Sequence, residues 1–419
     1  MKSKLFSLLA ISIALVSCSD SDDAPENPDV PGDTPSVEVQ KIKEISLSNT
    51  ETQMLKGESG FSFNLFSNVL EIEDTQDNIA ISPFGMYMDL ALVANGAEGQ
   101  SLEQILNALG HNNLDELNDL NKRLMKELPS IDKQTTLSVS NGIFVDENYK
   151  LTGTYSAIVK EYYDATSRSI VARTEKAKEE INNWCSSATN GKIKDFIVDA
   201  DEVRELNILN AAFFNGKWSK RFKPERNSAA LFHNANGTQT EIIIMNNSDS
   251  YKAIGVEGYT AIKMPYGRGN YEMIAILPDE GYDVKTVASM LSKENIADLN
   301  FDLYYVTLRF PKFSVSDKLD TTTWEDALKN MGITDIFSEK SNLPKILESQ
   351  NIFLNKLKQK VCIDVDESGT TAAQVTGSGG ATAVLPDEQI ELNFNKPFIY
   401  MIWESQTKTI LFMGAINKL

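Results

Sequence analysis

The side chains that most often perform catalytic chemistry are scarce in this 419-residue chain. It contains two histidines, His111 and His233, and three cysteines, Cys18, Cys185 and Cys362. Neither histidine has a second histidine or a cysteine at the spacing of a zinc site, so no metal and no cofactor are expected. The sequence also lacks a G-x-S-x-G elbow, a P-loop and a dinucleotide-binding fingerprint. These observations predict that the protein is not an enzyme.

One long segment of small side chains is a candidate of another kind, namely a peptide that a protease could cleave. Residues 366–388 read DESGTTAAQVTGSGGATAVLPDE, and from Ser368 to Leu385 they carry neither a charge nor an aromatic ring. Alternating apolar residues at 361–365 and 390–394 predict a strand on each side. A connection this long inside a compact domain needs a functional reason. Because its small and β-branched residues also fit a sheet, we expect the segment to exist both as an exposed loop and as an inserted strand.

The elements around this segment suggest a helical first part and a strand-rich second part. Apolar spacing, helix-start signals and helix-stop signals predict helices at 60–72, at 81–110 with a break at Gly96, and at 151–165, 174–189 and 321–333. After about residue 204, short β-rich runs separated by turn residues predict strands, which continue through 351–367 to the C-terminus. Helices followed by strands within one chain indicate an α+β fold.

The N-terminus predicts a targeting signal followed by a tether. A short basic head precedes an apolar run from Leu5 to Val16, which is too short to span a bilayer comfortably. The run ends in LVSC, which resembles a bacterial lipobox, so we expect residues 1–17 to be removed and Cys18 to be acylated. Residues 18–44 form the tether, since 19–38 hold seven acidic residues, no basic ones and four prolines. We therefore expect a bacterial outer-membrane lipoprotein, facing the cell surface or the periplasm, with the extracellular side favoured. A secreted protein cut elsewhere is the alternative.

Charge and cysteine content limit the partners and the covalent structure. The formal net charge is −19, which disfavours nucleic acid, heparin-like polyanions and acidic membrane surfaces as partners. Cys185 and Cys362 would remain after processing, and each lies in an apolar stretch. They could pair in an exported protein, but two buried free thiols are the preferred interpretation.

Several stretches in a fixed order resemble the serpin family. DESGTTAAQV resembles the serpin loop hinge, and further blocks resemble other parts of the family: NIAISPFGMYMDLALVANGAEGQS, INNWCSSATNGKIKDFI, NAAFFNGKWSKRF, MPYGRGNYEMIAILPDEG, LRFPKFSV, FNKPFIYMIWE and LFMGAI. The resemblance covers residues 45–419. It implies a serpin domain in which N-terminal helices pack on a large central mixed sheet, with further sheets and an exposed reactive loop at 367–389.

The resemblance also implies a function, the inhibition of serine endopeptidases by a suicide-substrate mechanism. A target protease would cleave the loop and form an acyl-enzyme, and the loop would insert into the central sheet before water released the enzyme. The expected partner is a protease in a covalent 1:1 complex with a monomeric inhibitor. The alternatives are a non-inhibitory binding serpin, an inhibitor of papain-like cysteine proteases and, outside the family, a surface hydrolase or glycan-binding lipoprotein.

The resemblance assigns a hinge and a reactive bond within the loop. The hinge residues are Glu367, Gly369, Thr370, Thr371, Ala372 and Ala373. The usual family spacing, counted from Glu367, places the reactive bond between Ala383 and Val384, with Thr382 and Leu385 as neighbours. Gln374 is larger than the residue usual at its position, and the glycines at 377, 379 and 380 are loose for a strand, so insertion could be slowed.

The composition of the loop constrains which protease it can bind. There is no lysine or arginine between Lys360 and Lys396, and no aromatic residue between Glu367 and Phe394. A trypsin-like enzyme therefore finds no suitable side chain, whereas small residues suit elastase-like or subtilisin-like proteases. Leu385 would suit a chymotrypsin-like enzyme only after a shift in register.

Four residues outside the loop match family positions beneath the sheet. Trp218 matches the tryptophan beneath the point where the loop inserts. Ser82 and Asn210 match polar residues under the centre of the sheet, where its strands part. Gln359 stands where the family usually has a histidine, so we expect this network to be arranged differently.

Overall fold

The computed structural model describes residues 43–73, 76–316, 319, 321–348, 351–354, 358–370 and 388–419. The fold described below is that of the unit formed by residues 41–419. The predicted signal, Cys18 and nearly all of the tether lie outside the described residues. No helix among the described residues has the length and apolar character needed to cross a membrane.

The helices begin at local signals that the sequence carries. Ser48 accepts a hydrogen bond from the Glu51 amide and forms a capping box, and Ser82 caps a helix whose first residue is Pro83. The described residues form eight α-helices: α1 (Asn49–Ile72), α2 (Pro83–Gly96), α3 (Gly99–Leu109), α4 (Leu114–Glu127), α5 (Gly153–Tyr163), α6 (Glu175–Ala188), α7 (Val284–Lys293) and α8 (Thr321–Asn330).

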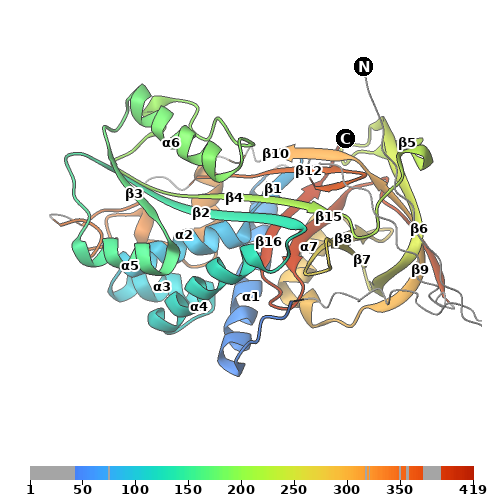
Figure 1. The fold of residues 1–419 in the computed structure, drawn as a ribbon, viewed down its shortest axis with the longest axis horizontal. Helices are drawn as coiled ribbons and strands as arrows, with labels where there is room; N and C mark the ends of the chain where they lie inside the picture. The colour runs from blue at the N-terminus through green and yellow to red at the C-terminus, as the bar shows by residue number, and fades with distance from the viewer. Residues whose placement is uncertain are drawn as a thin grey trace, which may run out of the picture. The chain divides into compact units, whose positions relative to one another are not determined.

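The strands of the described residues form two sheets (Figure 1). The seven-stranded sheet has the order β10 (Phe313–Ser316), β12 (Cys362–Asp366), β13 (Gly369–Thr370), β4 (Leu206–Lys217), β2 (Thr135–Asp146) and β3 (Thr166–Ile170), and β11 (Gln359–Lys360) also pairs with β4. It is mixed, because β2 runs parallel to β3 and antiparallel to β4.

The nine-stranded sheet is assembled largely from the second half of the chain. Its order is β1 (Ile79–Ile81), β16 (Ile410–Ile416), β15 (Phe398–Glu404), β8 (Tyr271–Pro278), β7 (Tyr259–Tyr266), β6 (Gln239–Val256), β9 (Asp302–Pro311) and β14 (Gln389–Asn393), and β5 (Ser228–His233) pairs with β6.

Helices cover both faces of the seven-stranded sheet. Every residue of α2 is buried, because this helix packs against β4 of one sheet and β16 of the other. On the opposite face, α6 packs on β2 and β4, where Trp184 meets the ring of Phe144 edge-on at 5.6 Å. Figure 1 shows α6 and α2 on opposite sides of these two strands. A strand added to this sheet would therefore lie between two packed layers of helices.

The predicted α+β class is confirmed, but the division into a helical and a strand-rich part is wrong. β2 and β3 lie in the first part and α7 lies in the second. Hydrophobic alternation is weak in β2, whose sequence is TTLSVSNGIFVD, and this strand forms because it pairs along its length with β4. The predicted strand over 351–367 is also too long: residues 351–354 have no regular structure, and pairing begins at Gln359.

Candidate loop-insertion site

The first residues of the small-residue segment already lie inside the seven-stranded sheet. Gly369 and Thr370 form β13, which pairs antiparallel with β12 on one side and with β4 on the other. Gly369 has φ +140°, and a Cβ atom there would lie 2.0 Å from the carbonyl oxygen of Gly216. Only glycine combines that backbone conformation with this close approach. The expected loop range, 367–389, thus begins with residues that are held in a turn and a strand.

A tight turn delivers the chain from β12 into β13. The Asp366 carboxylate accepts hydrogen bonds from the amides of Ser368 (2.7 Å) and Gly369 (3.3 Å), which reverses the chain. Glu367 projects from this turn and binds Lys312 and the side-chain amide of Asn227. Partial burial raises the pKa of Glu367, but the contacts with Lys312 and Asn227 outweigh it and leave the pKa below its ordinary value.

Aromatic rings hold the inserted residues from beneath. Thr370 is fully buried, and its hydroxyl forms a 2.7 Å hydrogen bond with the Tyr266 hydroxyl. Trp218 stacks on Tyr266 with 4.3 Å between ring centroids, and its indole N–H donates to the carbonyl of Asp366 at 2.9 Å. The Trp218 amide donates to the carbonyl of Ser368 at 2.9 Å. The structure therefore places Trp218 directly against the turn that leads into β13.

Ser82, Asn210 and Gln359, the other three predicted positions, come together at the far end of β4. Gln359 of β11 lies opposite Asn210 of β4 in a parallel pair. The buried Gln359 amide forms two 2.7 Å hydrogen bonds with the backbone of Ser82, donating to its carbonyl and accepting from its N–H. The Ser82 hydroxyl donates to the carbonyl of Leu411 at 2.7 Å and caps α2. This network joins both sheets and α2 without the family's usual histidine.

Asn210 extends the network across the sheet. Its side-chain N–H donates to Asn141 of β2 at 2.9 Å, and Asn141 donates to the carbonyl of Tyr163 at 2.9 Å. The Asn210 side-chain oxygen is buried and has no hydrogen-bond partner among the described residues. A Cβ atom on Gly85 would lie 2.6 Å from that oxygen, so α2 meets the sheet closely here.

Between these two ends, the described part of β12 makes no ladder with β4. β12 pairs with β10 and with β13, while β4 pairs with β11, with β13 and with β2. The central residues of β4, 212–215, and those of β12, 362–364, thus lack each other as sheet partners. A strand that continued β13 would pair with both.

A segment that follows α6 crosses β11 and β12. Lys192 forms an ion pair with Asp364 at 3.4 Å, and Glu202 forms one with Lys358 at 2.6 Å. Cys185 of α6 and Cys362 of β12 border the same apolar cluster. Both thiols are free, as expected, but Cys362 is only half-buried, because it lies at the margin of that cluster.

Several predicted site residues lie outside the described residues: Thr371, Ala372, Ala373, Thr382, Ala383, Val384, Leu385 and Cys18. The sequence reasoning missed three contacts of the hinge, namely Tyr266, Lys312 and Asn227. The Asp-x-Ser turn at 366–368 carries a recognisable local signal. The three missed residues have no such local signal, because they are far from the hinge in the sequence and reach it from β7, the β9–β10 link and the β4–β5 link.

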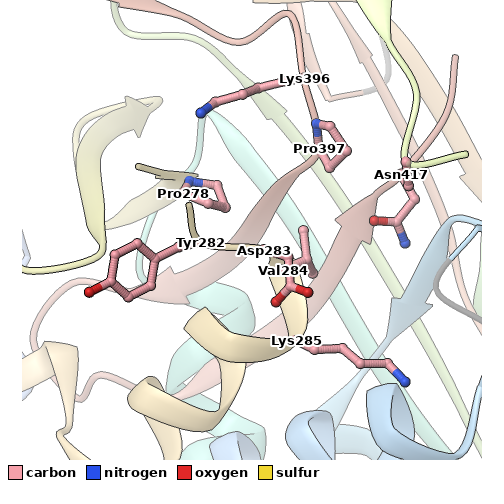
Figure 2. A pocket seen from close by; sticks show the side chains of 9 residues that line it. Pro278, Tyr282, Asp283, Val284, Lys285, Lys396, Pro397 and Asn417 are labelled. Carbon is pink, nitrogen blue, oxygen red and sulfur yellow. The ribbon is translucent and has the colours of Figure 1, made fainter. Parts of the chain in front are cut away.

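A cavity of about 270 Å³ lies elsewhere, at the start of α7. It is lined by residues of β8, α7 and the links beside β15 and β16, and none of them belongs to the hinge or to the network at Ser82. Figure 2 shows that the side chains of Lys285 and Lys396 point in different directions, so they do not form one focused cationic site.

The described site is a mixed sheet in which the first two residues of a long connecting segment pair between β12 and β4. The family described as "Serpin (serine protease inhibitor)" matches residues 56–419 of this sequence. The chain belongs to the serpin family, which confirms the resemblance seen in its motifs.

Individual relatives agree with this assignment. The chain is 32% identical over 365 residues to alpha-1-antiproteinase 2 of Equus caballus, with 85% of each protein covered. Among solved structures, the thermophilic serpin tengpin in its native state is 27% identical, with a TM-score of 0.80 over 90% of this chain and 96% of that one. Thyroxine-binding globulin in complex with thyroxine is 25% identical, with a TM-score of 0.76 over 87% of this chain and 99% of that one.

Proposed function

We propose that this protein inhibits serine endopeptidases by acting as a suicide substrate. The observation that carries the proposal is the burial of Thr370 between β12 and β4, which is the position at which an inserting loop would enter the sheet. The name of the horse relative, alpha-1-antiproteinase 2, points to the same activity in a similar protein.

The proposed mechanism couples peptide cleavage to sheet extension. The serine hydroxyl of the protease attacks a loop carbonyl, the peptide bond breaks, and the new amino terminus departs with a proton while the carbonyl carbon stays esterified to the serine. The freed loop then continues β13 along the unpaired parts of β12 and β4. Each added residue gains ladder hydrogen bonds and buries small side chains, so insertion is downhill once the loop is cut.

Completion of insertion requires the far end of the sheet to open. The pairing of Gln359 with Asn210 and the two hydrogen bonds that join the Gln359 side chain to the backbone of Ser82 hold that end closed. These contacts keep the uncut chain from accepting the whole loop. Hydrolysis of the ester competes with insertion, and the faster of the two decides whether the protein acts as an inhibitor or as a substrate.

The loop composition supports targets that accept small residues. The segment from Ser368 to Leu385 has no basic and no aromatic side chain, and the predicted bond lies between Ala383 and Val384. We therefore infer elastase-like or subtilisin-like targets. Papain-like cysteine proteases are the second class to test, because an acyl-thioester forms by the same attack.

The cellular location is a separate part of the proposal. The motif LVSC, which ends at Cys18, supports a lipoprotein anchored by an acylated cysteine, with the acidic tether between anchor and inhibitor. Mass spectrometry of the protein expressed in a bacterial host tests this: a diacylglyceryl adduct on Cys18 is expected. An unmodified mature chain that starts elsewhere would contradict the anchor.

The experiment for inhibition is a denaturing gel of the protein mixed with pancreatic elastase, subtilisin or papain. A complex that survives denaturant, with the mass of the protease plus the protein less its C-terminal loop fragment, is expected for at least one serine protease. Cleavage in the loop without a complex would favour a substrate or a binding serpin. As an independent test, the melting temperature is expected to rise after the loop is nicked, because insertion completes the sheet.

A further inference from the structure

The link between β4 and β5 is rich in basic residues, although the protein as a whole is acidic. Residues 218–227 contain four basic residues and one acidic residue, whereas the whole chain has a formal net charge of −19. Arg221, Lys223 and Arg226 of this link are exposed. These three residues are called the cationic turn below. None of them forms an ion pair or a side-chain hydrogen bond with a described residue.

The cationic turn has a fixed backbone. Phe222, between two of its members, is buried and meets the ring of Trp218 at 6.2 Å. The side-chain amide of Asn246 donates to the carbonyl of Arg226 at 2.7 Å. Lys220 is held apart from the turn by an ion pair with Asp249 at 2.7 Å. The three exposed cations are thus presented on a rigid support, which lowers the entropy lost when a partner binds them.

The cationic turn adjoins the hinge of the loop. Asn227, the next residue after Arg226, donates a side-chain hydrogen bond to Glu367. The described hinge does not neutralise the turn, because Glu367 binds Lys312 and no charge follows from Ser368 to Leu385. Glu225 offsets one of the three cations. A partner with exposed carboxylates would supply the remaining negative charge.

We propose that the cationic turn is a secondary docking site for acidic side chains beside the active-site cleft of the target protease. This inference rests on the proposed function, since a protease that attacks the loop is connected through that loop to the hinge. Charges at the rim of an interface act mainly on the association rate and on its salt dependence. The turn would select, among proteases with small-residue specificity, those with an acidic rim.

The test compares two variants of equal net charge. R221E/K223E/R226E reverses the cationic turn, and K126E/R168E/K176E reverses three exposed basic residues on α4, β3 and α6. The probes are subtilisin and subtilisin whose lysines have been succinylated, which replaces cations with carboxylates. Against the succinylated enzyme in about 0.02 M salt, we expect the association rate constant of the turn variant to be roughly tenfold below that of the control variant. The difference is expected to disappear at about 0.5 M salt. Equal rates for the two variants at low salt would overturn the proposal.

Two further measurements keep this test separate from the proposed function. If the unmodified inhibitor forms no covalent complex, the proposed inhibition fails, and docking is then measured as binding of succinylated subtilisin with its nucleophilic serine changed to alanine. Weaker binding by the turn variant than by the control would still support docking. If instead dextran sulfate accelerates inhibition by the wild type and by the control but not by the turn variant, while succinylation has no effect, the turn binds polyanions and the proposal is wrong.

Discussion

The two ends of the seven-stranded sheet are held in opposite ways. At the hinge end, formed by Trp218, Tyr266 and Thr370, the sheet has accepted two loop residues between β12 and β4. At the latched end, formed by Ser82, Asn210 and Gln359, β11 pairs directly with β4 and no position is open. The contrast separates an end of the sheet that pairs with the first loop residues from an end where β11 and β4 pair with each other.

The pKa values of two carboxyl groups, Glu367 and Glu58, are shifted in opposite directions. Glu367 at the hinge end has a lowered pKa because Lys312 and Asn227 outweigh its partial burial. Behind the latched end, Glu58 of α1 is fully buried, which raises its pKa from 4.5 to about 8 despite hydrogen bonds from Ser62 and the backbone of Ile410. Acid therefore weakens the hinge end and alkali weakens the latched end. Each prediction below perturbs one end and compares the result with the other.

The largest effect is expected from Thr370→Arg at the hinge end. Thr370 is fully buried, and a guanidinium in its place would lose several kcal/mol of hydration. Insertion should then fall behind ester hydrolysis, and the number of inhibitor molecules consumed per protease should rise at least about tenfold. Titration of residual protease activity measures this number. Thr370→Ser, which keeps the hydroxyl near Tyr266, is the control, and a wild-type stoichiometry for the arginine variant would show that insertion does not start here.

Gln359→Leu is expected to open the latched end. It removes two hydrogen bonds and leaves the buried N–H of Ser82 unpaired, while the Ser82 carbonyl keeps the Met86 amide as a donor, so the expected loss is about 1–3 kcal/mol of unfolding free energy. The variant should also convert faster, on warming, to a form with the uncut loop inserted. Urea unfolding and resistance of the loop to proteolysis measure the two effects. Gln239→Leu on the exposed part of β6 is the control, and equal stability of both variants would exclude a latch at Gln359.

Glu58→Gln tests the pH dependence behind the latched end. Because the pKa of Glu58 is raised to about 8 in the folded protein, the folded state holds this proton more tightly than the unfolded state between pH 4.5 and about 8. Its contribution to stability is present below pH 4.5 and is lost as the pH rises toward about 8, by at most about 1.4 kcal/mol per pH unit. We expect the unfolding free energy, measured with urea, to fall less between about pH 6 and about pH 8 in the variant than in the wild type. Parallel pH profiles of variant and wild type would contradict the assignment.

The smallest effect is expected from Trp218→Phe at the hinge end. The ring still packs on Tyr266, but the 2.9 Å hydrogen bond to the Asp366 carbonyl is lost, at about 1 kcal/mol. Amide hydrogen exchange at Ser368–Thr370 should accelerate while exchange at β11 stays unchanged. Trp184→Phe, which changes a tryptophan of α6, is the matched control. Faster exchange at β11 than at the hinge would mean that the two ends are not independent.

Local signals predicted much of the framework. The start of α2 at Ser82-Pro83, the strands on both sides of the loop and the helix over 321–330 follow from caps and alternation. The family resemblance brought Ser82, Asn210 and Gln359 to one place, as the structure has them. By contrast, β2 was not recognised, because its polar residues suit a strand only when β4 is beside it. The role of the reactive bond at Ala383–Val384 stays a prediction.

The sequence by itself determined what the loop can become, since small and β-branched side chains without charge can enter a sheet wherever one opens. Only the tertiary structure decided which residues Thr370 and Gln359 meet in the sheet. These partners are distant in the chain: Thr370 meets Tyr266 across 104 residues, and Gln359 meets Ser82 across 277. Contacts over such separations form only when the whole fold brings them together, so no local pattern can encode them.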